Sequence, residues 1–175
     1  MAIVYLGLGA NLGDRLSNLR AALVELAKHG EVVACSSVYE TSPWGVADQP
    51  PFLNMCGVLH TILDPEELLV ACKAIEQRLG RRPGRRWGPR LIDIDLLVYD
   101  AVRLTTPSLQ LPHPRLAERA FVLAPLAEIA PDLRIPGLTR TAAQLLARLP
   151  TAPEQAWVVA PPPRVDRGGE GPCCL

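Results

Sequence analysis

The order of strand-like and helix-like segments limits the fold of this chain more than any other feature. Four runs have the apolar character of buried strands: residues 2–9, 31–41, 52–63 and 91–99. Apolar residues three and four apart predict a helix that opens at Asn11 or Asp14 and ends at Gly30, and Asp64 begins a second helix that runs to about Gly80. The order β-α-β-β-α-β predicts an α+β, ferredoxin-like fold, an antiparallel sheet with helices packed on one face.

The rest of the chain is predicted to add helices and a tail to this core. The expected elements are a short arm at 102–105 paired with 91–99, a helix within 112–131, a helix at 141–149 and a short strand at 157–159. Pro and Gly are frequent after residue 160 and no apolar period continues, which predicts a flexible tail. The expected organisation is one domain over residues 1–160 and a tail over residues 161–175.

Composition excludes several classes of protein. The 18 basic and 18 acidic residues cancel, so no overall field draws the chain to nucleic acid or to a membrane surface. Five cysteines without a Cys-x-x-Cys pair favour free thiols in a reducing compartment. The N-terminus lacks the basic region of a secretion signal, and no apolar run approaches the ~20 residues of a membrane span. A cytoplasmic location is therefore expected.

The last strand of the core carries two acids that packing does not explain. Residues two apart on a strand point to the same face, so Asp93 and Asp95 project together, roughly 7 Å apart at the backbone. The apolar residues that alternate with them point into the core. Two like charges this close favour a bound cation such as Mg²⁺, which takes a few carboxylates and leaves positions for water and phosphate. Taken alone, the pair fits an ordinary solvated strand face equally well.

An arginine-rich window lies directly before these aspartates. It holds six arginines and no acid: Arg78, Arg81, Arg82, Arg85, Arg86 and Arg90. Guanidinium groups match phosphate oxygens in a bidentate way, and carboxylates hold the metal ions that accompany phosphates. The two features together indicate a polyphosphate clamp and phosphoryl transfer, in which catalysis rests on positioning and charge neutralisation.

Two other stretches allow a structural and a functional interpretation. Residues 7–14, GLGANLGD, follow a strand and open a helix, but their spacing fits neither the Rossmann nor the Walker A pattern, which favours a tight turn. The loop 42–54 brings Trp44, Phe52 and Asn54 together, a set that suits a flat heterocycle. Core packing explains Phe52 equally well.

A third stretch, LPHPRLAERAF, places a histidine between two prolines. The stiff backbone holds His113 in a fixed position, as a ligand-contacting group requires. Arg115 and Arg119 are four residues apart and are expected to share one face of the following helix. A helix-entry turn with surface arginines is as plausible from this stretch alone.

Together these pieces resemble the 6-hydroxymethyl-7,8-dihydropterin pyrophosphokinases of folate biosynthesis. The signature of that family stands complete at residues 86–97, RWGPRLIDIDLL, and three stretches agree in order: YLGLGANLGDR, ADQPPFLN and LPHPRLAERAFVLAPLAEIAPDL. The resemblance covers residues 2–150. It implies transfer of the β,γ-pyrophosphoryl group of ATP to the pterin hydroxymethyl oxygen, with release of AMP. A monomer is expected, with ATP and the pterin as its partners and neither nucleic acid nor a membrane.

The resemblance also implies individual roles. The implied catalytic residues are Arg81, Arg90, Asp93 and Asp95, of which the two aspartates would hold two Mg²⁺ ions. The residues implied to bind ATP are Glu76, Arg86, Trp87, Arg90, His113 and Arg119. The residues implied to bind the pterin are Ser42, Pro43, Trp44, Phe52, Asn54 and Phe121.

The chain departs from the family at two positions, and two rival functions compete with this interpretation. Phe52 stands where tyrosine can occur, and Lys73 replaces an uncharged amide, which suggests an added phosphate or ribose contact. An RNA-binding module is one rival, but the aromatic pattern of such sheets is absent, and Asp93 and Asp95 would repel a polyanion. An inactive scaffold protein of the folate pathway is another, which the intact aspartates and arginines disfavour.

Overall fold

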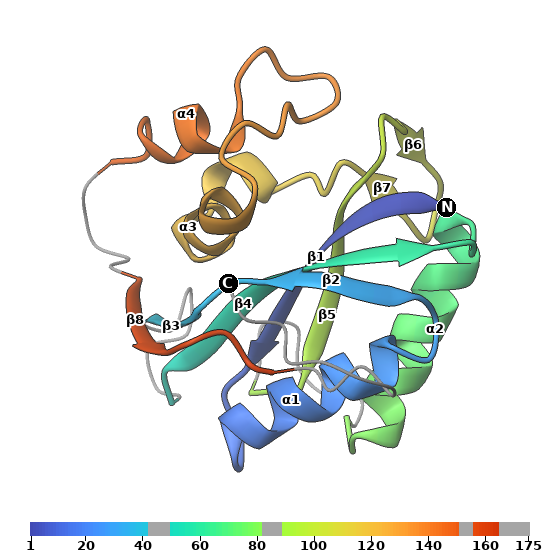
Figure 1. Cartoon of the computed structure of the whole chain (residues 1–175), viewed down its shortest axis with the longest axis vertical. Helices are drawn as coiled ribbons and strands as arrows, with labels where there is room; N and C mark the ends of the chain where they lie inside the picture. The colour runs from blue at the N-terminus through green and yellow to red at the C-terminus, as the bar shows by residue number, and fades with distance from the viewer. Residues whose placement is uncertain (42–49, 82–88, 151–155, 165–175) are drawn as a thin grey trace.

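The computed structural model describes residues 1–41, 50–81, 89–150 and 156–164. Its elements follow in this order (Figure 1): β1 (Ala2–Ala10), α1 (Arg15–Leu26), β2 (Glu31–Cys35), β3 (Val38–Thr41), β4 (Phe52–Thr61), α2 (Pro65–Arg78), β5 (Asp93–Tyr99), β6 (Leu104–Thr105), β7 (Gln110–Leu111), a 3₁₀ turn (Leu116–Glu118), α3 (Ala120–Ile129), α4 (Ala142–Leu146) and β8 (Trp157–Ala160).

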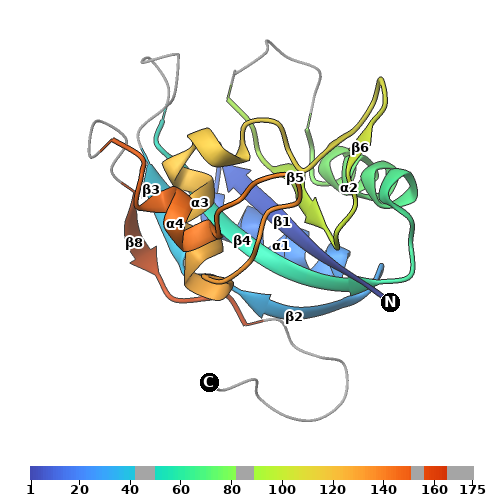
Figure 2. The same ribbon diagram turned by 90° about the horizontal axis from the view of Figure 1, so that it is seen from above.

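The main sheet has the strand order β5-β1-β4-β3-β8, with β2 also paired to β4, and its neighbouring strands are antiparallel. Helices α1 and α2 cover one face, and α3 and α4 lie on the other (Figure 1). Seen from above, α3 and α4 lie over the side of the sheet formed by β3 and β4 (Figure 2). The α+β, ferredoxin-like prediction is confirmed, and the C-terminal helices add a layer on the second face.

Alternation along the central strands separates two apolar layers. Leu6 and Leu8 of β1, with Ile94 and Leu96 of β5, are buried in the cluster that includes residues of α1 and α2. Leu97 faces the other way, into the cluster that includes α3. Each fully buried aliphatic side chain contributes about 1.5–3 kcal/mol through the hydrophobic effect. The core therefore fixes which face of β5 carries the aspartates.

The two predicted helix starts are confirmed. Asp14 caps α1 by accepting a hydrogen bond from the Ser17 backbone N–H at 3.0 Å. Asp64 caps α2, and Glu67 returns a hydrogen bond to the Asp64 backbone, which completes a capping box. These caps place α1 and α2 directly after β1 and β4, so both helices pack back on the same face.

The predicted strand over residues 31–41 is wrong as a single element, because Ser36 interrupts it. The Ser36 backbone N–H donates to the Cys56 carbonyl, while the Cys56 N–H donates to the Ser36 hydroxyl, each at 2.9 Å. A side chain thus takes the place of a backbone acceptor in the ladder, and the strand divides into β2 and β3.

The predicted pairing of residues 102–105 with the last core strand is also wrong. Asp100 adopts a left-handed conformation, with φ of 43°, and Val102 N–H donates to the Tyr99 carbonyl, so the chain turns away after β5. Leu104–Thr105 pairs instead with Gln110–Leu111 in a separate small sheet.

Three of the five cysteines lie in the described part of the chain, and all three are free thiols: Cys56 and Cys72 are buried and Cys35 is half-buried. Residues 165–175, which hold Cys173 and Cys174 and most of the predicted tail, lie outside it. None of the described helices has both the length and the apolar character that a membrane crossing requires.

Candidate active site

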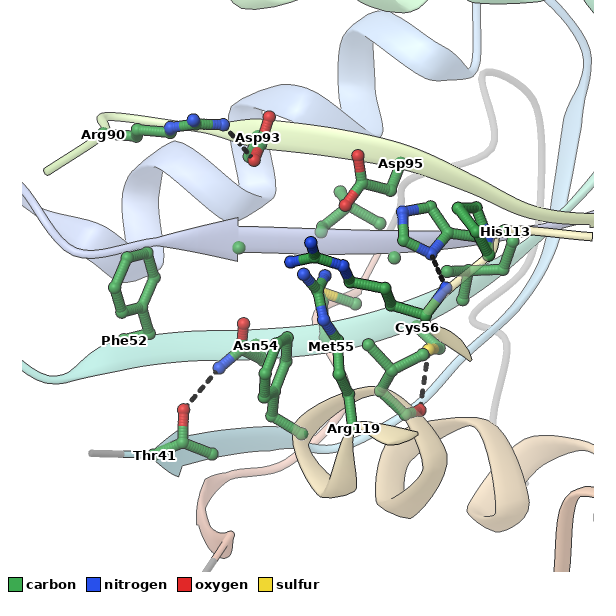
Figure 3. Close-up of a pocket in the computed structure, with 18 residues that line it drawn as sticks. Thr41, Phe52, Asn54, Met55, Cys56, Arg90, Asp93, Asp95, His113 and Arg119 are labelled. Atoms are coloured by element: carbon green, nitrogen blue, oxygen red, sulfur yellow. Dashed lines mark hydrogen bonds and ion pairs between the residues drawn. The ribbon is translucent and has the colours of Figure 1, made fainter. Parts of the chain in front are cut away.

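A pocket of about 570 Å³ opens on the sheet face opposite α1 and α2. Strands β1, β4 and β5 and the chain from 113 to 122 form its walls. It is lined by Gly7, Leu8, Gly9, Thr41, Phe52, Asn54, Met55, Cys56, Arg90, Asp93, Asp95, Leu97, His113, Pro114, Arg115, Arg119, Phe121 and Val122. Eight of the predicted site residues therefore share one cavity, with Phe52 and Asn54 on one strand and the aspartates on another (Figure 3).

Two glycines of β1 leave bare backbone beside the aspartates. Gly7 is paired with Asp95 and Gly9 with Asp93 across the β1–β5 ladder. A Cβ atom on Gly9 would lie 3.0 Å from Asn54 Oδ1, and one on Gly7 would lie 3.4 Å from the Leu97 side chain. The absent side chains thus open space for a ligand beside the carboxylates.

Asp93 is bound by two arginines that flank it in sequence. Arg81 Nη1 donates to Asp93 Oδ1 at 2.7 Å, and Arg90 Nη1 donates to Asp93 Oδ2 at 2.5 Å. The three side chains are about one quarter exposed, so solvent screens these pairs only in part. The fold thus brings two arginines of the predicted window, Arg81 and Arg90, onto one carboxylate, Asp93.

Asp95 is the contrasting carboxylate. It points into the pocket (Figure 3), and no hydrogen bond or ion pair among the described residues engages it. Burial raises the pKa of Asp95, and the nearby Asp93 raises it further, while Lys73, Arg119 and Arg90 oppose the rise. A buried carboxylate whose negative charge these neighbours only partly offset is suited to binding a cation.

Glu76 of α2 lies outside the pocket lining and contacts the site residues from the buried side of the sheet. Its side chain is 1% exposed, accepts a hydrogen bond from the Ile94 backbone N–H at 2.8 Å, and forms ion pairs with Lys73 and Arg81. Burial raises the pKa of Glu76, an effect that Lys73 opposes. Because Arg81 bridges Glu76 and Asp93, this buried acid holds the arginine that neutralises the Asp93 carboxylate. The Lys73 ammonium, for which a phosphate or ribose contact was expected, lies 2.8 Å from Glu76.

His113 and Arg119 form a polar wall beside the aspartates, and the His113 backbone N–H donates to the Leu97 carbonyl of β5 at 2.8 Å. The Arg115 backbone N–H donates to His113 Nδ1 at 3.2 Å, which leaves the proton of the neutral ring on Nε2. Burial, with Arg119 and Arg115 nearby, lowers the pKa of His113 to about 4. The Arg119 guanidinium lies over the Phe121 ring, 5.4 Å from its centroid. At neutral pH this wall offers a neutral imidazole and cationic guanidinium groups.

The expectation that Arg115 and Arg119 lie on one helix face is wrong. Arg115 precedes the 3₁₀ turn, and Arg119 has extended backbone angles of −117° and 112° just before α3. Both nevertheless line the pocket, because the extended residue redirects the chain between the two helical segments.

Asn54 is held in one orientation by a residue that sequence reasoning missed. Its Nδ2 donates to Thr41 Oγ1 at 2.8 Å, and Asn54 itself is buried (Figure 3). This leaves Oδ1, above Gly9, as the acceptor on the pocket side. Neither Thr41 nor the role of Gly9 was foreseen, although a glycine two residues from another inside an apolar strand was a usable signal.

Cys56 also lines the pocket without having been predicted there. Its thiol donates to the Val122 carbonyl at 3.7 Å, and burial raises its pKa well above the ordinary value. The thiol therefore remains protonated and packs the floor instead of acting as a nucleophile.

Five predicted site residues lie outside the described part of the chain: Ser42, Pro43, Trp44, Arg86 and Trp87. Their roles stay predictions. Arg82 and Arg85 of the arginine-rich window also lie outside the described residues. Arg78 turns away from the pocket, with its guanidinium 3.4 Å from Glu25 of α1.

The fold and site define a class: a ferredoxin-like domain with a pocket that joins a carboxylate–arginine end to an aromatic–amide end, as a transferase of phosphoryl groups to a flat acceptor requires. Residues 5–131 match the model of the 7,8-dihydro-6-hydroxymethylpterin-pyrophosphokinase family. The chain belongs to this family.

Curated relatives support the same assignment. The 2-amino-4-hydroxy-6-hydroxymethyldihydropteridine pyrophosphokinase of Methylorubrum extorquens is 50% identical over 151 residues, which is 85% of this chain and 94% of the relative. The enzyme of the same name from Bacillus subtilis is 49% identical over 129 residues, or 73% of this chain and 77% of the relative.

Among solved structures, Plasmodium falciparum HPPK-DHPS has a similar fold, with a TM-score of 0.66 and 19% identity. The match covers 85% of this chain but only 43% of the Plasmodium chain. At this identity the likeness supports the fold alone.

Proposed function

We propose that this chain transfers pyrophosphate from ATP to 6-hydroxymethyl-7,8-dihydropterin, giving the pterin diphosphate and AMP, in folate biosynthesis. The hydroxymethyl oxygen would attack the β-phosphorus and lose its proton, while the bond from that phosphorus to the α,β-bridging oxygen breaks and AMP leaves. The observation that carries the proposal is the placement of Asp93 and Asp95 on one strand face, beside arginines and across the pocket from Phe121 and Asn54.

The donor set fits magnesium. Among the described residues no cluster of three or more His, Cys, Asp or Glu could hold a metal ion by itself. Mg²⁺ is commonly held by one or two carboxylates together with substrate phosphates, which two aspartates beside an arginine clamp can provide. Asp93 and Asp95 would hold two such ions, which when bound neutralise phosphate charge and align the reacting oxygens.

The arginines on Asp93 supply the matching charge for the transferred group. Arg81 and Arg90 now neutralise Asp93, so they become available to phosphate oxygens when that carboxylate takes a cation. Glu76 keeps Arg81 from leaving the site altogether, because it holds the same guanidinium from the buried side. Glu76 would thus support ATP binding through Arg81.

The other nucleotide contacts would come from the wall that holds His113 and Arg119. Arg119 would bind phosphate oxygens, and His113, neutral at pH 7, would donate from Nε2. Within the described part of the pocket no group is placed and charged as a strong general base, so alignment and charge neutralisation would carry the rate. Arg86 and Trp87, together with Arg90, are proposed as further ATP contacts from their sequence positions.

The aromatic end suits the pterin. Phe52 and Phe121 both line the pocket and would pack against the two faces of the ring, while Asn54 Oδ1 would accept an N–H from its edge. Ser42, Pro43 and Trp44 are proposed to complete this end. A monomeric, cytoplasmic enzyme without nucleic-acid or membrane partners completes the proposal.

The test is AMP formation from ATP with the reduced pterin alcohol, with and without Mg²⁺. We expect AMP only when all three are present. ATP binding measured by calorimetry should require Mg²⁺. RNA binding in the absence of Mg²⁺-dependent ATP binding would overturn the proposal in favour of a nucleic-acid-binding module.

A further inference from the structure

One buried amide outside the pocket lining contacts the entry to two strands of the site. Asn11 follows β1 and is 1% exposed. Its Oδ1 accepts a hydrogen bond from the Arg90 backbone N–H at 2.7 Å, and its Nδ2 donates to the Pro50 carbonyl at 3.2 Å. Arg90 and Pro50 are 40 residues apart in sequence, so a single side chain joins two distant segments.

These two segments lead to opposite ends of the pocket. Arg90 is followed by β5 and pairs through its side chain with Asp93, at the phosphate end. Pro50 is two residues before Phe52, which begins β4 at the pterin end. Neither strand contacts the other directly in the ladder, because β1 lies between them. The carboxamide of Asn11 therefore bridges the two strand entries.

Neighbouring contacts make this bridge part of a fixed turn. The Arg90 carbonyl accepts hydrogen bonds from the backbone N–H groups of Asn11, at 3.0 Å, and Leu12, at 3.2 Å. Arg15 Nη1 donates to the Pro51 carbonyl at 2.8 Å and also pairs with Glu40. The turn after β1 is thereby fastened to both segments by backbone and side-chain groups.

We propose that Asn11 is a positioning residue for pyrophosphoryl transfer, setting the separation between Arg90 at the phosphate end and Phe52 at the pterin end. This inference rests on the proposed function. The site needs one donor and one acceptor on a short, buried side chain, which a carboxamide supplies and a carboxylate or an aliphatic group does not. An in-line transfer is sensitive to such spacing, because a misplacement of about 1 Å can cost about 10²-fold in rate.

The test compares two substitutions at Asn11 with a matched control. Asn11→Ala removes the hydrogen bonds to Arg90 and Pro50, and Asn11→Asp keeps the volume and the acceptor for Arg90 but places an oxygen against the Pro50 carbonyl. The control is Asn18→Ala, which removes an amide that donates to the Leu12 carbonyl at 3.0 Å in the same turn and contacts neither Arg90 nor Pro50. Thermal unfolding, kcat, and calorimetric Kd values for a Mg²⁺-loaded, non-hydrolysable ATP analogue and for the pterin are measured on each folded variant.

We expect kcat to fall about 10- to 100-fold in Asn11→Ala, with the Kd of the ATP analogue changed less than about threefold. Asn11→Asp should raise the Kd of the pterin more than that of the nucleotide, since only the contact to Pro50 is lost. Asn18→Ala should keep kcat within about threefold of the wild type.

A purely structural role gives a different pattern. Lower melting temperatures with wild-type kcat per folded enzyme, or failure of both Asn11 variants to fold, would overturn the inference. The proposed function fails separately, and takes this inference with it, when the wild-type chain itself shows no Mg²⁺-dependent ATP binding.

Discussion

The two faces of the central sheet are formed by the same strands, but alternate residues along those strands place different kinds of side chain on each face. On the face toward α1 and α2, Leu8 and Ile94 are buried in a continuous apolar layer. On the other face, the neighbouring positions Gly9, Asp93 and Asp95 have either no side chain or a carboxylate. The face toward α1 and α2 thus stabilises the fold, and the face that carries the aspartates is less tightly packed there and forms a pocket.

The second face is itself divided. Over β4, α3 packs Val122 and Leu123 against the sheet, which closes one part of it. Over β1 and β5 no comparable apolar layer among the described residues covers the aspartates, and the adjacent wall is the polar pair His113 and Arg119. The pocket thus lies where the helix cover of the sheet ends. Residues adjacent in sequence on β5 therefore have different tasks: some stabilise the core, and others line the pocket.

The largest effect is expected from two separate substitutions in β5, one on each face of the strand. Asp95→Asn should lower kcat by about 10³-fold or more, because it removes a charge that the proposed function assigns to holding the cation. It should leave the stability of the ligand-free protein unchanged or raised, because burial already disfavours the Asp95 carboxylate and raises its pKa. Ile94→Ala should cost about 2–5 kcal/mol of unfolding free energy and spare kcat of the folded enzyme.

Urea unfolding and AMP release per folded enzyme measure both members of this pair. The division between the two faces of β5 is contradicted if Asp95→Asn unfolds more easily than the wild type, or if it turns over at the normal rate. The second result would also remove Asp95 from the metal site.

A pH effect should come from the wall of the pocket. The pKa of His113 is lowered to about 4 by burial, Arg119 and Arg115, from an ordinary value near 6.5 in the unfolded chain. The unfolded state therefore binds the proton more readily, so stability rises with pH between about 4 and 6.5 and is complete above that window. Relative to neutral pH, the unfolding free energy at pH 4 should be lower by on the order of 3 kcal/mol.

The measurement is the unfolding free energy from pH 4 to 7 in the wild type and in His113→Gln, which cannot take up the proton. The difference between them should grow as the pH falls through 6.5. Parallel curves would show that His113 titrates normally and is not desolvated by this wall.

The aromatic end offers a test of intermediate size. Phe121→Ala should weaken pterin binding by about 10-fold and nucleotide binding much less, because stacking contributes about 0.5–1.5 kcal/mol beyond the buried area. Phe121→Leu is the matched control, since it keeps apolar volume but removes the flat face. Calorimetry with each ligand measures the difference, and equal losses for pterin and nucleotide would exclude a pterin sandwich.

Much of this division could be predicted from the sequence because it follows from local rules. The alternation in residues 91–99 placed Asp93 and Asp95 on one face and the isoleucines on the other, as the structure confirms. The capping signals at Asp64 and the order of apolar runs were sufficient for α2 and for the fold class.

What could not be predicted depends on contacts between distant segments. Nothing near Ser36 in sequence indicates that its hydroxyl replaces a ladder acceptor for Cys56, 20 residues away. The hold of Glu76 on Arg81 and the Ile94 N–H likewise needs the packed arrangement of α2 and β5. Local spacing also misled where an extended residue, Arg119, separates two helical segments.

The smallest effect is expected from adding one methyl group to the bare part of the pocket floor. In Gly9→Ala the new Cβ would lie 3.0 Å from Asn54 Oδ1, so the amide held by Thr41 must shift by a few tenths of an ångström. Pterin affinity should fall about threefold to tenfold, or about 1 kcal/mol, since one hydrogen bond of ordinary strength is distorted.

In Gly7→Ala the Cβ makes only ordinary contacts with Leu97 at 3.4 Å, so pterin affinity should change less. Calorimetry on the two variants, with thermal unfolding as a check of folding, separates them. Equal pterin affinities for Gly9→Ala and the wild type would mean that Asn54 does not read the ring edge, and the floor beside β4 would then serve only to admit the ligand.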